Sequence, residues 1–194
     1  MTRIWLALSL AALGLLAGCA GGGQGRSMDD PGNSLVFGYI DMADAPTAIS
    51  GASIGQVAPS SDDLYWNAAA RNGLFYTYDL PPGSYQLASV SGSDLRKVAY
   101  EYDLPRQDLE HALITRPGIY FLGSYRYVDT GEAGAFEIER MDTPTEAQLL
   151  QRILEEDGAV KGSAWEARIR ERLSQLESAP PSRGPSVLLA RRLK

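Results

Sequence analysis

Residues 73–87 read GLFYTYDLPPGSYQL, and this stretch carries the clearest fold signal in the chain. Its first half, from Leu74 to Leu80, is rich in aromatic side chains, which favour β-strands. The turn Pro81-Pro82-Gly83 follows, where proline fixes φ and glycine is free to adopt a positive φ. Tyr85 and Leu87 then lie two positions apart, so both re-enter the core on one face. The stretch predicts two strands joined as a hairpin.

The same strand-and-turn pattern extends from Ser34 to Arg140, where short apolar or alternating runs are broken by Gly, Pro, Asp and Ser. Several short strands at this spacing predict a mainly β chain folded as an antiparallel β-sandwich over residues 34–141. Strands are expected at residues 35–41, 52–57, 74–80, 85–91, 96–102, 111–115, 119–127 and 135–140.

Residues 73–87 resemble the G-x-F-x-x-x-x-L-P-P-G-x-Y-x-L signature of prealbumin-like and carboxypeptidase-regulatory-like β-sandwiches. Residues 117–123 (PGIYFLG), followed by proline-capped helices, are similar to bacterial lipoproteins that carry such a domain. The resemblance spans roughly residues 35–177 and rests on short motifs. It implies binding, spacing or scaffolding, and no catalysis.

The hydrophobic period changes after Met141, where two helices are expected in residues 142–178. Two capping boxes are predicted at the helix starts, Thr143-Pro144-Thr145-Glu146 and Ser163-Ala164-Trp165-Glu166. The first helix should stop near Gly158. Each helix has one apolar stripe, and that of the second contains Trp165, Ile169, Leu173 and Leu176, opposite Arg168, Glu171, Arg172 and Gln175. The helices are therefore expected to pack as a hairpin on the sandwich.

The chain begins like a lipoprotein precursor. An apolar run from Ile4 to Leu16 follows Arg3 and is too short to span a membrane. Leu16-Ala17-Gly18-Cys19 ends it and resembles the lipobox of bacterial lipoproteins. That resemblance implies that residues 1–18 are cleaved as a signal peptide and that Cys19 is acylated. It also implies an outer-membrane location, because position 20 is Ala and not the Asp that retains lipoproteins in the inner membrane. The glycine-rich residues 19–33 read as a flexible tether, and residues 179–194 as a flexible tail.

Composition excludes several classes of function. The chain has 18 basic and 24 acidic side chains, a net charge of −6, and cleavage after Gly18 would also remove the positive charge of Arg3. Such a chain is a poor candidate for nucleic acid or for an anionic membrane surface. With Cys19 lipidated, no disulfide or thiolate metal site can form, and one histidine excludes a site with two imidazoles. No phosphate loop or zinc motif occurs, and we expect neither cofactor nor metal.

The strongest catalytic candidate is Ser53, because residues 51–55 (GASIG) match the G-x-S-x-G nucleophile elbow. An elbow requires a helix after the second glycine, yet Gln56-Val57-Ala58-Pro59 follows. His111 is the only possible imidazole base. We expect Ser53 to be structural and His111 to be an ordinary strand residue facing solvent.

Other polar and aromatic side chains are weaker candidates. Carboxylates of Asp62, Asp63, Asp103, Asp108 and Glu110 could ligate calcium, but EF-hand spacing is absent, and Glu155-Glu156-Asp157 reads as a solvated helix end. Tyr65 and Trp66 are candidate ligand-binding aromatics among ten tyrosines and three tryptophans, most of which should lie in the core.

The sequence thus predicts an outer-membrane lipoprotein on the periplasmic side. Its sandwich is expected to be a non-enzymatic binding or scaffolding module with an envelope protein as partner. Two alternatives stay open. One is a periplasmic hydrolase that uses Ser53 or a carboxylate pair; the other is an assembly factor for a secreted or outer-membrane partner, acting through the apolar-basic tail VLLARRLK at residues 187–194.

Overall fold

The computed structural model describes residues 30–58, 65–93, 99–104, 109–132 and 135–178. Its strands are β1 (Ser34–Asp41), β2 (Ile49–Ala58), β3 (Tyr65–Arg71), β4 (Leu74–Leu80), β5 (Gly83–Ser93), β6 (Ala99–Asp103), β7 (Ala112–Ile114), β8 (Ile119–Asp129) and β9 (Phe136–Met141). Two helices follow, α1 (Glu146–Glu156) and α2 (Ala164–Ser178). The predicted mainly β class with two C-terminal helices is confirmed.

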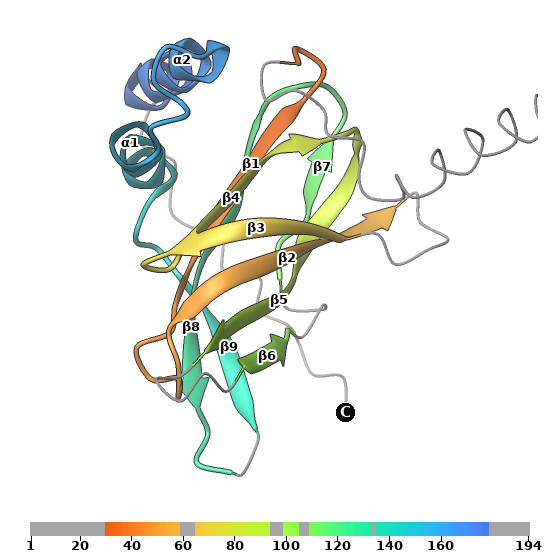
Figure 1. Ribbon diagram of the computed structural model, residues 1–194, viewed down its shortest axis with the longest axis vertical. Coiled ribbons are helices and arrows are strands. Elements are labelled where there is room, and N and C mark those ends of the chain that lie inside the picture. Colours follow the sequence, from red (N-terminus) through yellow and green to blue (C-terminus); the bar gives the residue numbers. More distant parts are fainter. Residues whose placement is uncertain (1–29, 59–64, 94–98, 105–108, 133–134, 179–194) are drawn as a thin grey trace, which may run out of the picture.

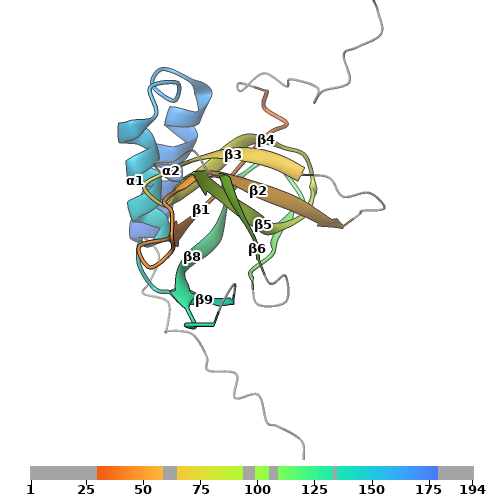
Figure 2. The same ribbon diagram turned by 60° about the horizontal axis from the view of Figure 1, so that its bottom comes forward.

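All nine strands belong to one hydrogen-bonded sheet in the order β6-β5-β2-β3-β4-β1-β8-β9, with β7 paired to β5. The sheet curls over on itself into a sandwich-like shape (Figures 1 and 2). Its two ends meet through aromatic contacts, since the ring of Tyr102 on β6 lies 5.6 Å from that of Tyr127 and 5.8 Å from that of Phe136. An antiparallel sheet was expected, and the strand pairs are antiparallel except for β1 and β8, which are parallel.

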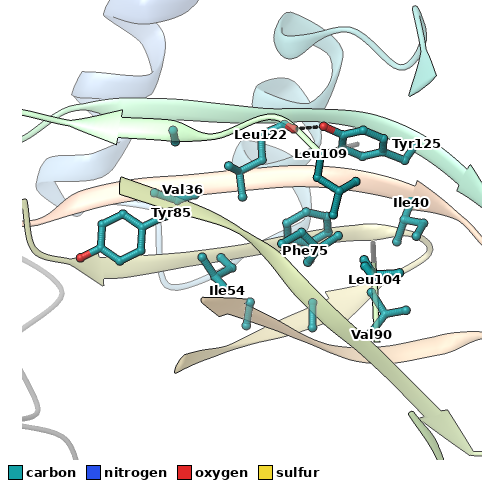
Figure 3. Packing of buried hydrophobic residues seen from close by; sticks show 14 of the residues in the cluster. Val36, Ile40, Ile54, Phe75, Tyr85, Val90, Leu104, Leu109, Leu122 and Tyr125 are labelled. Atoms are coloured by element: carbon teal, nitrogen blue, oxygen red, sulfur yellow. Dashed lines mark hydrogen bonds between the residues drawn. The ribbon is translucent and has the colours of Figure 1, made fainter. Parts of the chain in front are cut away.

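The interior between the two layers is filled by apolar side chains. Val36 and Phe75 from one layer face Ile54 and Val90 from the other, as Figure 3 shows. Tyr125 is buried with them, and its hydroxyl donates to the Leu122 carbonyl at 2.7 Å. Burial raises the pKa of Tyr125 to about 12. The expectation that most tyrosines serve the core holds for this one.

The Pro-Pro-Gly turn is not a hairpin, which corrects one prediction. β4 pairs with β1 and β3, whereas β5 pairs with β2, β6 and β7, so the turn carries the chain between non-adjacent strands. The buried ring of Tyr85 supports this corner, since its hydroxyl donates to the Pro81 carbonyl at 2.9 Å. The turn Pro117-Gly118 is supported in the same way, because the Tyr120 hydroxyl donates to the Arg116 carbonyl at 2.7 Å. Tyr85 and Leu87 do return to the core on one face, as predicted.

The tight hairpin lies elsewhere, between β4 and a strand that was not predicted. β3 pairs with β4 through the two-residue turn Asn72-Gly73, where both residues have positive φ (47° and 80°). Asn-Gly is the favoured sequence for such a turn. The strand was missed because Ala68-Ala69-Ala70 gives no alternating pattern.

Both helices pack on the outer face of β1 and β4, where they form a second core. Leu35, Phe37 and Leu74 of the sheet meet Leu149, Leu150 and Ile153 of α1. Trp165 and Ile169 of α2 are buried there, and Leu173 and Leu176 are partly buried. The two helices lie side by side on one flank of the sheet (Figure 2). The predicted docking of the apolar stripes is confirmed.

The details at the helix ends differ from expectation. The N-cap of α1 is Thr145, whose capping partner is Gln148, so the box proposed at residues 143–146 was two residues early. At α2 the Ser163 hydroxyl accepts from the Trp165 amide at 3.2 Å, while Glu166 accepts from the Gly162 amide. Asn33, assigned to the tether, is fully buried.

The polar face of α2 differs from expectation at Arg168, and its Arg172 has a specific partner. Arg168 is half-buried and not opposite the stripe, because its guanidinium lies over the Trp165 ring at 3.8 Å from the ring centroid. Arg172 forms a two-pronged ion pair with Glu146 of α1, at 2.8 and 3.0 Å. Both arginines are half-buried, whereas Glu171 and Gln175 are exposed.

Candidate functional site

A polar groove lies on the outer face of the sheet, away from the helices. It has a volume of about 620 Å³ and runs over β2, β5 and β6, with one wall from β3. It is lined by Ser53, Tyr65, Ala88, Ser89, Glu101, Asp103 and Leu104. Hydroxyl and carboxylate groups therefore dominate its surface.

The strand register explains why these groups meet. Asn67 of β3 pairs with Ser53 of β2, Ser53 pairs with Ser89 of β5, and Ser89 pairs with Asp103 of β6. Paired residues in neighbouring strands point to the same face of a sheet. One row of four polar side chains thus crosses four strands. In the next row Gly51 pairs with Ser91, and Ser91 pairs with Glu101.

Hydrogen bonds link the side chains along and between these rows. The Ser53 hydroxyl donates to Asn67 Oδ1 at 3.4 Å, and the Ser89 hydroxyl donates to Glu101 Oε1 at 3.1 Å. Ser89 is buried, while Glu101 and Asp103 are exposed. The floor is therefore made of short, fixed hydroxyl groups, with two carboxylates standing at the edge strand.

Tyr65 forms an aromatic wall of the groove and is 44% exposed. It is paired with Gly55 on β2, and a Cβ atom at Gly55 would lie only 3.2 Å from Tyr65 Cε1 and 3.2 Å from the Ala88 side chain. The missing side chain at Gly55 therefore lets the Tyr65 ring lie low across β2. An aromatic ring placed in this way offers a surface on which a ligand can stack.

The groove is acidic. Its described lining contains Glu101 and Asp103 and no Lys, Arg or His side chain. The lining favours neutral or cationic ligands and disfavours anionic ones. Within the described ranges, no group of three or more His, Cys, Asp or Glu side chains is arranged to hold a metal ion.

Ser53 is brought into this groove, but not as a nucleophile elbow. It lies in the middle of β2, between residues that pair on both sides, and not at a turn from strand to helix. Its hydrogen-bond partner is the side-chain oxygen of Asn67, which is no general base. His111 precedes β7 and is exposed outside the described lining.

The two candidate aromatics are separated by the pleat of β3. Tyr65 lines the groove, whereas Trp66 packs against the interior core. The ring of Trp66 makes an edge contact with Tyr85, with centroids 5.3 Å apart. Adjacent strand residues face opposite sides of a sheet, so only Tyr65 is placed to meet a ligand in the groove.

The candidate carboxylates also separate. Asp103 lines the groove, while Glu110 forms an ion pair with Arg140. At the end of α1, Glu155 is exposed, Glu156 pairs with Arg152, and Asp157 is the C-cap and accepts a hydrogen bond from the Tyr78 hydroxyl at 2.8 Å. Asp62, Asp63 and Asp108 lie outside the described residues.

Sequence reasoning did not single out Glu101 or Ser89. The alternation in Ala99–Asp103 contains the signal for Glu101, because it places Glu101 and Asp103 on one face and Tyr100 and Tyr102 on the other. Ser89 lies in the groove because it pairs with Ser53 and Asp103, and this non-local register has no signature in the sequence.

The predicted lipobox residues Leu16, Ala17, Gly18 and Cys19 lie outside the described residues, as does the tail 179–194. Among the helices that the structure describes, none is both long and apolar enough to cross a membrane. Comparison of the chain with protein-family models, with curated proteins and with solved structures found no match. Function is therefore inferred from the residues and their geometry.

Proposed function

We propose that this protein is a bacterial lipoprotein, acylated at Cys19 and held on the periplasmic side of the outer membrane, that acts as a non-enzymatic binding module. Its ligand-binding surface is the polar groove over β2, β5 and β6. The ligand class that suits the groove best is a neutral saccharide. An envelope protein that delivers or carries this ligand would be the partner.

The proposal is supported above all by the register row Asn67–Ser53–Ser89–Asp103 beside the exposed Tyr65 ring. A saccharide presents several hydroxyl groups on one edge and an apolar ring face on the other. Carboxylate and amide oxygens accept from such hydroxyls, serine hydroxyls both donate and accept, and an aromatic ring packs on the apolar face. The short side chains leave space for a ring to lie flat.

The charge of the groove supports the same ligand class. Two carboxylates with no cation in the described lining repel phosphorylated and other anionic ligands. Hydrogen bonds from ligand hydroxyls to carboxylates are stronger than neutral ones. A neutral saccharide gains these bonds without the cost of burying an unpaired ligand charge.

The test is a calorimetric titration of the full-length protein with an uncharged oligomer of β-1,4-linked N-acetylglucosamine. The protein is kept in polyoxyethylene micelles, because detergents with sugar headgroups would compete. Asp103→Asn should weaken binding about tenfold, the effect of losing a charge-assisted hydrogen bond. Asp142→Asn, the same change at an exposed site away from the described groove lining, is the matched control. Absence of binding by the wild type contradicts the saccharide proposal.

A glycoside hydrolase is the second candidate, because Glu101 and Asp103 share one face of β6. Residues two apart on a strand are about 6.6–6.8 Å apart along it, which is near the carboxyl separation of roughly 6.5–9.5 Å in inverting enzymes. Both side chains are exposed, however, whereas a catalytic acid is usually held in apolar surroundings. Shortened oligomers after incubation, lost in Glu101→Gln, would favour this candidate over a binding module.

The lipid anchor has its own test. Cells grown with an alkyne fatty acid should label the wild-type protein but not Cys19→Ser, because the thiol is the proposed site of acylation. Equal labelling of both proteins would contradict the anchor without bearing on the groove. The assembly-factor alternative depends on residues 187–194, and a protein that lacks these residues tests it without the loss of any described residue.

A further inference from the structure

A second cavity, of about 450 Å³, lies between α2 and the segment that leads into β8. Arg116 and Tyr120 line one wall, and Arg168, Glu171 and Arg172 line the other. Three arginines thus converge in a chain whose net charge is −6. The net charge argued against an anionic partner, but it says nothing about how charge is distributed.

Arg168 is the most constrained of the three. Its guanidinium lies over the Trp165 ring at 3.8 Å, and one Nη2 donor makes a long bond of 3.4 Å to the Asn33 carbonyl. No carboxylate of the described residues forms an ion pair with it. Partial burial lowers the pKa of Arg168. The stacking fixes the plane of the guanidinium and leaves donors at its edge for an acceptor in the cavity.

The other two arginines differ in how their charge is used. Arg172 is held by Glu146, so its charge is largely balanced. Arg116 is exposed and, among the described residues, forms no ion pair with a carboxylate. Its backbone is fixed by the Tyr120 hydroxyl, which donates to the Arg116 carbonyl. Arg116 and Arg168 therefore face one cavity from different elements without an ion-pair partner among the described residues. With Arg172 balanced by Glu146, these two cations exceed the one other carboxylate of the lining, that of Glu171.

The cavity lies at the point where the N-terminal segment joins the folded domain. Asn33, which accepts from Arg168, is buried immediately before β1, and the Gly118 amide donates to the Ser34 hydroxyl at 3.2 Å. Only the short segment 20–32 separates Cys19 from Asn33. If Cys19 is acylated, as proposed above, this short segment keeps the N-terminal end of the domain within reach of lipid headgroups.

We propose that this cavity is an anion site in which Arg168 and Arg116 bind a phosphate group, that of an anionic phospholipid. Guanidinium groups form two-pronged, charge-assisted hydrogen bonds with phosphate oxygens. Basic pockets beside a membrane are suited to lipid headgroups. Occupied by a headgroup, the site orients the domain on the membrane; it lies over α2 and β8, whereas the groove lies over β2, β5 and β6. The lipid source rests on the proposed anchor, while the anion chemistry does not.

The experiment follows the side-chain Nε–Hε NMR signals of Arg116 and Arg168 in the full-length protein in polyoxyethylene micelles. Three probes are titrated separately at constant ionic strength: sodium phosphate, dihexanoylphosphatidylglycerol and the zwitterionic dihexanoylphosphatidylcholine. Arg168→Gln and Arg116→Gln are compared with Arg170→Gln. Arg170 is the matched control, because it is on the same helix, pairs with Glu166 and is 65% exposed.

Phosphatidylglycerol should shift both signals and bind more tightly than phosphatidylcholine or free phosphate. Each pocket variant should weaken it about tenfold, and Arg170→Gln should leave it unchanged. Equal losses in all three variants would overturn the site in favour of general surface charge. Free phosphate binding as tightly as the lipid would overturn the lipid source. Arg168→Gln could fail to fold because it loses the contact with Trp165. In that case Arg116→Gln alone tests the anion site, because the exposed Arg116 side chain is not part of either core.

Discussion

The outer surface of the curled sheet carries two regions of opposite character. On β1 and β4 the outward side chains Leu35, Phe37 and Leu74 are apolar and covered by helices. On β2 and β5 the outward positions include Gly55, which has no side chain, and the short side chains of Ser53 and Ser89, and this surface is left as an open groove. One sheet therefore packs against helices where its outward side chains are apolar, and it leaves an open polar surface where its outward side chains are short and polar.

The burial patterns of the strands reflect this difference. Five consecutive residues at the start of β1 are buried, because one set faces the interior and the other faces the helices. In β2 exposed or half-exposed positions alternate with Ala52 and Ile54, which face only the interior. A strand buried on both faces reads as a continuous apolar run, whereas a half-buried strand alternates.

The largest expected effect tests the covered region. Trp165→Ala should lower the free energy of unfolding by about 3–5 kcal/mol, because the ring is 1% exposed and fills the space between α2 and the sheet. Urea denaturation of the full-length protein measures it. Ser174→Ala, at an exposed position of α2, is the control, and Tyr65→Ala in the groove region should cost far less than Trp165→Ala.

A wild-type urea midpoint for Trp165→Ala would show that the helices are not stably docked. Isolated helices of this length are marginal in water, so their stability has to come from this packing. The apolar stripe would then be a free surface for a partner, and the assembly-factor alternative would gain support.

The second effect concerns pH and the polar link under the helices. The Tyr78 hydroxyl donates to Asp157, and burial together with this carboxylate raises the pKa of Tyr78; the same two causes raise the pKa of Tyr76 to about 12. A folded-state pKa above the unfolded value of about 10 means that folding favours the protonated phenol. The stabilisation is complete below about pH 10 and is lost as pH rises above it.

Tyr78→Phe should therefore change stability in two separable ways. Loss of the hydrogen bond to a charged group lowers the free energy of unfolding by about 1.5 kcal/mol at neutral pH. The decline of the urea midpoint between about pH 10 and pH 12 should become shallower than in the wild type. Identical slopes in the two proteins would mean that Tyr78 does not resist ionisation in the folded state.

The sequence was informative where structure is local. The strand-rich pattern, the Pro-Gly turns and the stripe of Trp165 and Ile169 all depend on neighbours within a few residues, and each is found in the structure. The turn Asn72-Gly73 was an equally local signal and would have revealed β3 had it been weighed.

Long-range pairing could not be predicted. The hairpin expected at Pro81-Pro82-Gly83 is a corner between strands that do not pair, and the parallel β1–β8 pairing joins segments that lie far apart in the sequence. The groove depends on this pairing, because Ser53, Ser89 and Asp103 come from three strands. The contact of Arg168 with Trp165 is different, because residues three apart on a helix are neighbours, so this local signal was present in the sequence.

The smallest expected effect tests the open region. Ser53→Ala should change the free energy of unfolding by no more than about 0.5 kcal/mol, because it removes one long hydrogen bond to an exposed Asn67 from the middle of β2. The substitution only replaces the hydroxyl by a hydrogen and leaves the backbone groups in place, so the β2 pairing is kept. A screen of the full-length protein with esterase and peptidase substrates should give the same blank result for wild type and variant, because Ser53 lies mid-strand and its partner is no base. Turnover by the wild type that Ser53→Ala abolishes would replace the binding module with a hydrolase that uses Ser53 as its nucleophile. A large loss of stability without turnover would instead mean that the polar row, like the helix-covered face, is needed for the fold.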